Sequence, residues 1–363
     1  MMKRNILAVV IPALLAAGAA NAAEVYNKDG NKLDVYGRAE ARYEFVDQDN
    51  GDGNSDKTRA RLGVRGETQI TDQLTGYGRY ELQFGATKND HNGVDTRLAF
   101  AGLKFADYGS LDFGRNAGIL RGAIDYTDIL PNYSGDFGGT DHFLTDRSSG
   151  VLTYRNTDFF GLVDGLNFGL QYVEKDESAG SSIRFNNGTA FQDFEEDTPH
   201  GDGWGTSVSY DSDIGLGVIA TYASVDRASH TQGDVSGQKA DTIIGGVKYD
   251  ANSVYLAAIY GQSRNLAAYS GVWADKTKFF EVSAAYNFDF GLTPSIIYSQ
   301  AKADNDTAQI DDYSSKYVAL SADYAFNKNI NTYAVYKINL IDSDNKYGVS
   351  DDDAVFVGLK YQF

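Results

Sequence analysis

Residues 32–45, KLDVYGRAEARYEF, decide the fold because polar and apolar side chains alternate along them. The even-numbered positions carry charges or tyrosine, and the odd-numbered positions are apolar or small. Since side chains of a β-strand point alternately to its two faces, the stretch predicts a strand with one polar and one apolar face. Residues 59–70, RARLGVRGETQI, repeat the pattern, with arginines opposite Leu62, Val64 and Ile70.

Segments of this kind continue to the C-terminus and are separated by breaks rich in Gly, Asp and Asn. Sixteen of them begin near residues 32, 58, 74, 95, 109, 150, 166, 203, 215, 240, 253, 278, 293, 315, 330 and 353. Short connections alternate with long ones near 47–57, 87–94, 117–149, 175–202, 225–239, 263–277, 303–314 and 340–352. This alternation is typical of outer-membrane barrels, with tight periplasmic turns and long external loops. It therefore predicts an all-β fold, a 16-stranded antiparallel transmembrane β-barrel; a soluble β-sandwich, the alternative, needs no such asymmetry.

The last strand supports closure of the barrel. Val355, Val357, Leu359, Tyr361 and Phe363 share one face, and the chain ends on that aromatic residue. Because lipid tolerates no unpaired strand edge, we expect the last strand to pair with the first.

Composition excludes several classes of protein. The chain has 32 Lys and Arg residues and 50 Asp and Glu residues, a net charge of −18, which disfavours nucleic-acid binding. The absence of cysteine removes disulfides, thiolate nucleophiles and Cys-ligated zinc. Beyond the N-terminal segment, no apolar run approaches the roughly 20 residues of a membrane-spanning helix.

The first 22 residues have the pattern of a secretory signal peptide. Lys3 and Arg4 precede an apolar stretch, 6–17, and Ala20-Asn21-Ala22 forms a small-x-small cleavage site. We expect residues 1–22 to be removed on export, leaving a barrel of residues 23–363 with a charge of −20.

If the apolar face meets lipid, the polar face lines the lumen. Sixteen strands enclose a space too wide for side chains to fill, so a water channel is expected. Arginines then point inward from neighbouring strands, with nearby carboxylates to balance them: Arg38, Arg42, Arg59, Arg61, Arg65, Arg79 and Arg97. The alternative is that these arginines are solvated on an ordinary exposed sheet.

The longest connection, 117–149, is too apolar for a disordered tail. Its residues include Ile124, Tyr126, Leu130 and Phe143, so we expect a folded loop that packs against another part of the protein.

Signals for catalysis or metal binding are weak. The four histidines lack metal-ligand spacing, and no G-x-S-x-G, H-E-x-x-H or Walker pattern occurs. Residues 47–52 resemble the start of a calcium loop but lack the closing glutamate. We therefore expect no enzyme activity, no cofactor and no metal.

Several long blocks of the chain closely resemble the general diffusion porins of Gram-negative outer membranes, the OmpF, OmpC and PhoE family. The blocks include AEVYNKDGNKLDVYGR (23–38), ARLGVRGETQI (60–70), TRLAFAGLKFADYGSLDFGRN (96–116) and FFGLVDGLNFGLQY (159–172). The resemblance implies a homotrimer in outer-membrane lipid and lipopolysaccharide, whose external loops are candidate phage or colicin receptors. It also implies that loop 117–149 folds into the pore and narrows it.

The resemblance further implies which residues form that constriction. Its basic side would be Arg38, Arg61, Arg97 and Arg147. Its acidic side would include Asp128 and Asp136, but PNYSGD (131–136) departs from the usual PEFGGD. Asn132 therefore stands where the family has a carboxylate, and Ser134 replaces a glycine.

The expected function is passive diffusion of small hydrophilic solutes and ions through a weakly cation-selective pore. Three alternatives were weighed. A barrel lipase or protease needs a Ser/His or Asp/His constellation at the rim, for which no motif is present. A sugar-specific channel needs a run of aromatic residues rather than a basic ladder, and a receptor with a plugged lumen would show no single-channel conductance.

Overall fold

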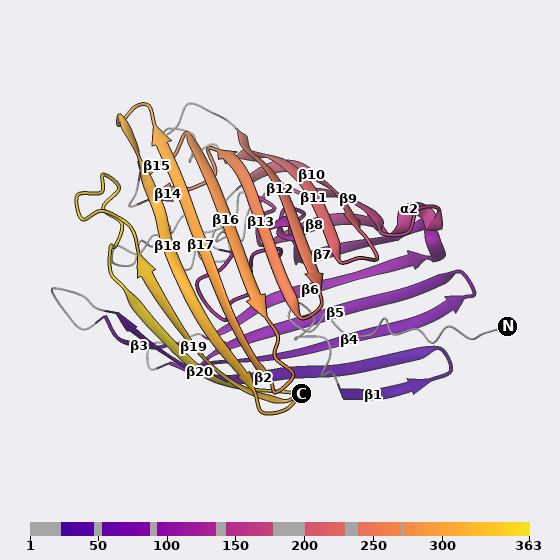
Figure 1. The fold of residues 1–363 in the computed structure, drawn as a ribbon. Helices are drawn as coiled ribbons and strands as arrows, with labels where there is room; N and C mark the ends of the chain where they lie inside the picture. The colour runs from indigo at the N-terminus through magenta and orange to yellow at the C-terminus, as the bar shows by residue number, and fades with distance from the viewer. Residues whose placement is uncertain are drawn as a thin grey trace.

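The computed structural model describes residues 23–46, 53–87, 93–135, 143–176, 200–228, 239–269 and 272–363, so the expected signal peptide lies outside the described residues. Antiparallel strands dominate the described part (Figure 1). The long strands are β2 (Asn31–Val46), β4 (Arg59–Thr71), β5 (Leu74–Gly85), β6 (Val94–Phe105), β7 (Ser110–Ala117), β8 (Arg147–Asn156), β9 (Leu166–Val173), β10 (His200–Asp211), β11 (Leu216–Arg227), β12 (Lys239–Ala251), β13 (Val254–Arg264), β16 (Lys276–Tyr286), β17 (Leu292–Asn305), β18 (Ile310–Ala325), β19 (Ile330–Asn339) and β20 (Ala354–Gln362).

The remaining elements are short. They are β1 (Ala23–Lys28), β3 (Ser55–Asp56), β14 (Ala268–Tyr269), β15 (Val272–Trp273), η1 (Ala106–Tyr108), α1 (Arg121–Ile124) and α2 (Asp158–Gly161). Within the described ranges, no helix is long and apolar enough to span a membrane.

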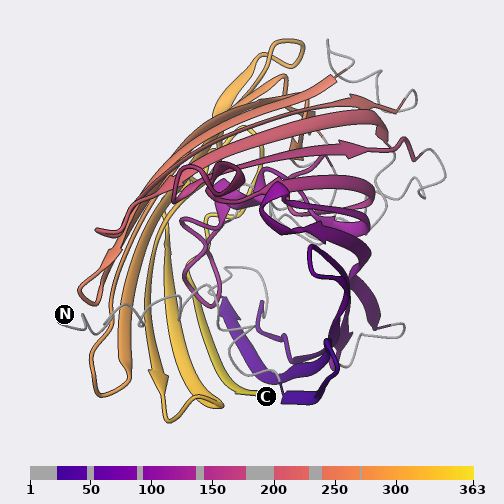
Figure 2. The ribbon, with the colours of Figure 1, turned by 90° about the vertical axis from the view of Figure 1, so that its right-hand side faces the viewer.

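Each long strand pairs with the next, and the last pairs with the first. β20 runs antiparallel to β2, from Arg38 opposite Gln362 to Val46 opposite Ala354. Beyond that ladder, Gly37 and Phe363 exchange two backbone hydrogen bonds of 3.0 Å. The predicted closed barrel of sixteen strands is confirmed, and Figure 2 shows the strands as a ring.

The strand β1 was not among the predicted segments, which begin at residue 32. It forms a hairpin with β2 through Asp29 and Gly30, whose φ angles of 55° and 74° are those of a tight type I′ turn. β1 and the end of β20 lie along the same edge of β2, since Ala23 pairs with Val35 and Phe363 pairs with Gly37. β1 and the end of β20 thus cover one edge of β2 together.

The barrel is apolar outside and polar inside, as the alternation predicted. On β2, Phe45 is 45% exposed and Tyr43 is 39% exposed, whereas Asp34 and Glu40 are each only 3% exposed. A soluble protein would place these side chains the other way round. The outer surface is therefore suited to lipid.

Two predicted boundaries were wrong. The connection expected at 303–314 is only residues 306–309, because β17 and β18 continue pairing past a bulge at Ser314 of β18, where Ala301 is opposite Ser315 and Lys302 is opposite Tyr313. The extra residue shifts the alternation of β18 by one, so the polar start of this strand has the pattern of a loop. The long loop spans 118–146 rather than 117–149, because Arg147 already pairs with Ala117.

We predict that Leu359→Arg destabilises the folded barrel by about 2–4 kcal/mol, the cost of placing arginine at the bilayer midplane. Leu359 faces outward in β20 and is 51% exposed. Lys360→Arg, the matched control on the neighbouring inward position, should change stability little. The measurement is the urea dependence of the folded band, which migrates differently from heated protein on a gel. An equal response at both positions would contradict the assignment of faces in β20.

Candidate functional site

The loop between β7 and β8 lies against the inner wall of the barrel (Figure 2). Its described parts are residues 118–135 and 143–146, so Asp136 lies outside them. Leu120, Ala123 and Ile124 in and before α1 are fully buried. These apolar residues belong to the main buried cluster, which also contains wall residues of β11, β12 and β13. The loop therefore has its own contact surface on the wall.

Glycines on the wall make room for the loop. The Ile119 side chain lies where a Cβ on Gly205 or Gly169 would stand, at only 2.5 and 2.9 Å from those positions. Any larger residue there would push Ile119 off the wall.

Hydrogen bonds fix the middle of the loop to the wall opposite β4–β6. The Tyr255 hydroxyl donates to the backbone oxygen of Tyr126 over 2.7 Å. The Thr127 hydroxyl donates to Glu281 Oε2 over 2.6 Å, and Glu281 is 1% exposed. These bonds attach the loop to β13 and β16.

The tip of the loop reaches β2. Arg42 Nη2 donates to Asn132 Oδ1 over 3.0 Å, and the Arg42 guanidinium stacks 4.5 Å above the Phe356 ring. The Tyr133 hydroxyl donates to Glu44. Asn132 therefore contacts a wall arginine, at the position where the family pattern has a carboxylate.

Three of the four predicted basic residues lie on adjacent parts of the barrel wall that faces the loop. Arg38 on β2 is directly opposite Arg61 on β4, and Arg61 is within electrostatic reach of Arg97 on β6. Arg61 Nε donates to Gln83 Oε1 over 2.8 Å rather than to a carboxylate. Arg147 begins β8, within electrostatic reach of Arg97, with its Nη1 2.9 Å from Asp146 Oδ2.

Arginines on β2, β4, β5 and β6 form a basic wall, and two buried glutamates hold it together. Glu40 Oε2 is 2.8 Å from Arg59 Nε and 3.7 Å from Arg38 Nη2. Glu81 Oε1 is 2.8 Å from Arg97 Nε, and its Oε2 is 2.8 Å from Arg79 Nη2. Arg59, which the family pattern leaves without a role, is thus an ion-pair partner of Glu40.

Tyrosines lying flat on the wall orient both glutamates. The Tyr333 hydroxyl donates to Glu40 Oε1 over 2.8 Å, and the Tyr36 hydroxyl donates to Glu81 Oε2 over 2.8 Å. Each ring covers a glycine of the neighbouring strand: a Cβ on Gly358 or Gly63 would lie only 2.2 or 2.1 Å from the ring. The glycines allow this approach, so each carboxylate is fixed by a hydroxyl as well as by arginines.

The wall carries a surplus of positive charge. Six guanidinium groups lie around two buried glutamates there: Arg38, Arg42, Arg59, Arg61, Arg79 and Arg97 with Glu40 and Glu81. Carboxylates were predicted to balance the arginines, and these two glutamates form ion pairs with four of the six.

The loop carries an arginine–aspartate cluster of which only Asp128 was predicted as a site residue. Arg121 pairs with Asp125 and Asp128, and its Nη1 lies 3.4 Å from Asp146 Oδ1. The Ser134 hydroxyl donates to Asp128 Oδ1 over 2.8 Å. Asp128, predicted as an acidic site residue, is therefore already paired. The four-residue spacing of Arg121 and Asp125 was the available signal, since it places them on one side of a helical turn.

Burial and charge oppose each other in this cluster. Burial alone would lower the pKa of Arg121, but Asp128, Asp125 and Asp146 outweigh it and raise that pKa. Burial, reinforced by Asp128 and only partly offset by Arg121, raises the pKa of Asp125 to about 6. The Asp125 side chain is still 41% accessible, so it faces the interior space of the barrel and is not enclosed in a closed core. Asp125 is therefore a group of the loop that changes charge near pH 6.

No group of three His, Cys, Asp or Glu side chains in the described ranges is arranged to hold a metal ion.

Comparison with known proteins gives consistent matches over nearly the whole chain. The family model described as Gram-negative porin matches residues 28–363. Outer membrane porin C of Enterobacter cloacae subsp. cloacae is 49% identical over 372 residues, and outer membrane porin F of Escherichia coli (strain K12) is 48% identical over 380; each alignment covers 100% of both chains. The solved structure of Salmonella typhi OmpF with daunomycin superposes with a TM-score of 0.84 at 41% identity, covering 94% of this chain and 100% of that one.

We predict that Asp125 gives the selectivity of the lumen a pH dependence near pH 6. Protonation between pH 7 and 5 removes one negative charge from the loop, so any preference for cations should fall. Because the folded-state pKa exceeds the ordinary 3.8, the stability contributed by Asp125 is present below about pH 4 and is lost as pH rises through about 6. Reversal potentials at several pH values measure the first effect. Asp125→Asn should remove this step, and an unchanged titration in that variant would exclude Asp125 as its origin.

Proposed function

Because the chain belongs to the Gram-negative porin family, whose members are passive outer-membrane channels and not enzymes, we propose that the loop 118–146 and the basic wall form the constriction of its pore. The protein is an outer-membrane porin, a non-specific channel for passive diffusion of small hydrophilic solutes and ions. Arg38, Arg61, Arg97 and Arg147 form the basic side of the proposed constriction. Asp128, Asn132 and Asp136 belong to its loop side.

One observation carries this proposal: the loop is attached to the wall at both its middle and its tip. The Thr127–Glu281 bond holds the middle at β16, and the Asn132–Arg42 bond holds the tip at β2. A loop held at two points keeps a fixed position in the lumen, so solutes are selected by size at a defined opening. The arginines on β2, β4 and β6 give that opening a transverse electric field.

We further propose weak cation selectivity. The region 23–363 carries −20, and its acidic external loops concentrate cations at the mouth. The surplus of positive charge on the basic wall acts in the opposite direction and lies nearer to the permeating ion. The Debye length is about 8 Å at physiological ionic strength, so charges across a wet vestibule are screened more than those at the constriction. The net preference is therefore small and fades as salt concentration rises.

The proposal includes how the protein is exported and assembled. The charged, apolar and small-residue regions of residues 1–22 support a signal peptide cleaved before Ala23. The resemblance to trimeric diffusion porins supports a homotrimer in contact with outer-membrane lipid and lipopolysaccharide. The long external loops are the candidate attachment sites for phages or colicins.

Conductance in a planar bilayer tests the function. We expect stepwise insertion of open channels whose current is proportional to salt concentration, with a small reversal potential of cation sign in a potassium chloride gradient. A barrel that inserts without conductance would overturn the channel function and favour a plugged receptor.

We predict that Asn132→Glu strengthens the preference for cations. A carboxylate at the loop tip would pair with Arg42 and remove one charge from the basic surplus. The measurement is the shift of the reversal potential relative to the parent and to Asn132→Gln, the uncharged control of similar length. No shift, or a shift toward chloride, would contradict the placement of residue 132 at the constriction.

A further inference from the structure

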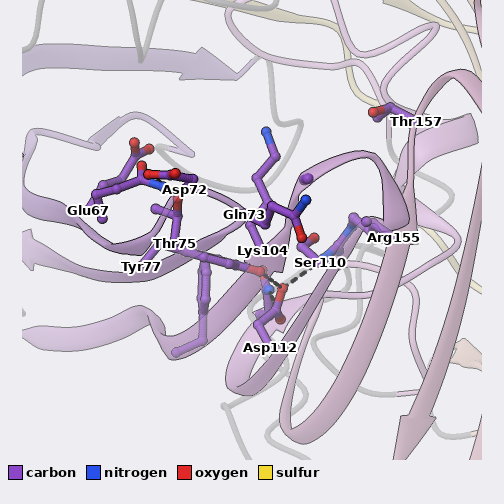
Figure 3. Close-up of a pocket in the computed structure, with 15 residues that line it drawn as sticks. Glu67, Asp72, Gln73, Thr75, Tyr77, Lys104, Ser110, Asp112, Arg155 and Thr157 are labelled. Carbon is purple, nitrogen blue, oxygen red and sulfur yellow. Dashed lines mark hydrogen bonds and ion pairs between the residues drawn. The ribbon is translucent and has the colours of Figure 1, made fainter. Parts of the chain in front are cut away.

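A second site lies on the inner wall at the short-turn end of β4–β8, away from the loop tip. It is a pocket of about 690 Å³ between the ends of these strands (Figure 3). Pockets that bind small molecules have volumes of about 300–1,000 Å³ and combine apolar surface with a few converging polar groups. The short turns of such barrels face the periplasm, so the pocket lines the periplasmic vestibule.

The pocket has an aromatic floor. The Tyr77 ring lies across Gly102, where an added Cβ would be 2.8 Å from Tyr77 Cζ. Its hydroxyl donates to Asp112 Oδ2 over 2.9 Å, which fixes the ring flat on the wall. Phe100 packs edge-on against Tyr77 with ring centroids 6.3 Å apart. Together the two rings give the pocket an apolar surface between its charged sides.

One side of the pocket is basic, with spare hydrogen-bond donors. Lys104, Ser110 and Arg155 form one row across β6, β7 and β8, with Lys104 opposite Ser110 and Ser110 opposite Arg155. Within the described residues, Lys104 forms no ion pair. Arg155 has a single long contact, 3.4 Å from Nη1 to Asp112 Oδ2, and is 39% exposed. Since adjacent strands are about 4.8 Å apart, both long side chains can reach one oxyanion above Ser110.

The other side of the pocket is acidic. Glu67 on β4 is directly opposite Tyr77, and Asp72 follows in the turn after β4. In the part of the chain that the structure describes, neither carboxylate has an ion-pair partner. Figure 3 shows Glu67 and Asp72 on the side of the floor away from Arg155. The pocket therefore has an acidic end, an aromatic floor and a basic end.

We propose that this pocket binds a small organic zwitterion whose ammonium and carboxylate groups lie at opposite ends of an apolar ring, of the aminoalkyl-benzoate type. Its carboxylate is held by Lys104 and Arg155 over Ser110, its ammonium group by Glu67 and Asp72, and its ring by Tyr77. Such a solute is retained briefly in the vestibule after it has passed the constriction. This inference rests on the proposed channel function only for access to the site; binding itself requires no conductance.

Titration calorimetry on the detergent-solubilised full barrel tests the proposal with three probes. They are 4-(2-aminoethyl)benzoate, which carries a charge at each end of its ring, benzoate, which carries only the carboxylate, and phenethylamine, which carries only the ammonium group. We expect a dissociation constant for 4-(2-aminoethyl)benzoate on the order of millimolar, and binding weaker by about fivefold for each probe that lacks one charge. Equal binding of all three probes, or no heat with 4-(2-aminoethyl)benzoate, would overturn the site.

Charge-removing variants locate the binding. Lys104→Gln should weaken the binding of 4-(2-aminoethyl)benzoate and of benzoate by about fivefold and leave the binding of phenethylamine unchanged. Glu67→Gln should weaken the binding of 4-(2-aminoethyl)benzoate and of phenethylamine and leave the binding of benzoate unchanged. Neither side chain has a hydrogen bond to lose in the described structure, so both variants should fold. Lys328→Gln, which removes a lysine from a different short turn, is the matched control.

The two proposals fail in different ways. A conducting channel whose binding of 4-(2-aminoethyl)benzoate is unchanged in the Lys104 and Glu67 variants overturns the pocket alone. Absence of conductance overturns the proposed function and leaves the calorimetric test of the pocket intact.

Discussion

Backbone amides and carbonyls in the hydrocarbon zone of a membrane must find partners within the protein, because no water is available there. In this chain that requirement is met by one closed ladder, in which β20 pairs with β2 and completes the ring. The ring fixes which residues face the lumen, since a shift of one residue in any strand would turn every side chain to the other face. The positions of the arginines, of the loop and of the vestibule pocket all depend on that register.

Inside the ring, the wall combines charge with very small residues. Glycines at Gly63 and Gly358 allow tyrosine rings to lie flat, and the hydroxyls of those rings hold Glu81 and Glu40. The same arrangement recurs at Gly102, where Tyr77 reaches Asp112. A flat tyrosine adds rigidity without narrowing the pore, and a fixed carboxylate keeps closely spaced guanidinium groups in place.

Much of the fold could be predicted from alternation alone, because the two faces of each strand meet very different surroundings. The stretch 32–45 predicted both its strand and its inward charges. Alternation failed where it was interrupted: the bulge at Ser314 hid the start of β18, and β1 is too short to show a pattern. The partners of Arg121 and Asn132 could not be predicted either, because they depend on how a long loop folds in three dimensions. Similarity to a family indicated which arginines belong together, but it could not show that Asp128 is already paired or that Arg59 supports Glu40.

The shared edge of β2 has a consequence for the order of folding. Gly37 bonds to Phe363, so the closing contact joins residues almost a full chain length apart. Contacts of such large sequence separation form slowly, because much of the chain must be ordered before they can form. Beyond the part that β1 covers, this edge of β2 stays unpaired until β20 has been synthesised and has arrived beside it. The polypeptide therefore cannot complete this structure during translation, and it must be kept from aggregating through that open edge until the last strand docks.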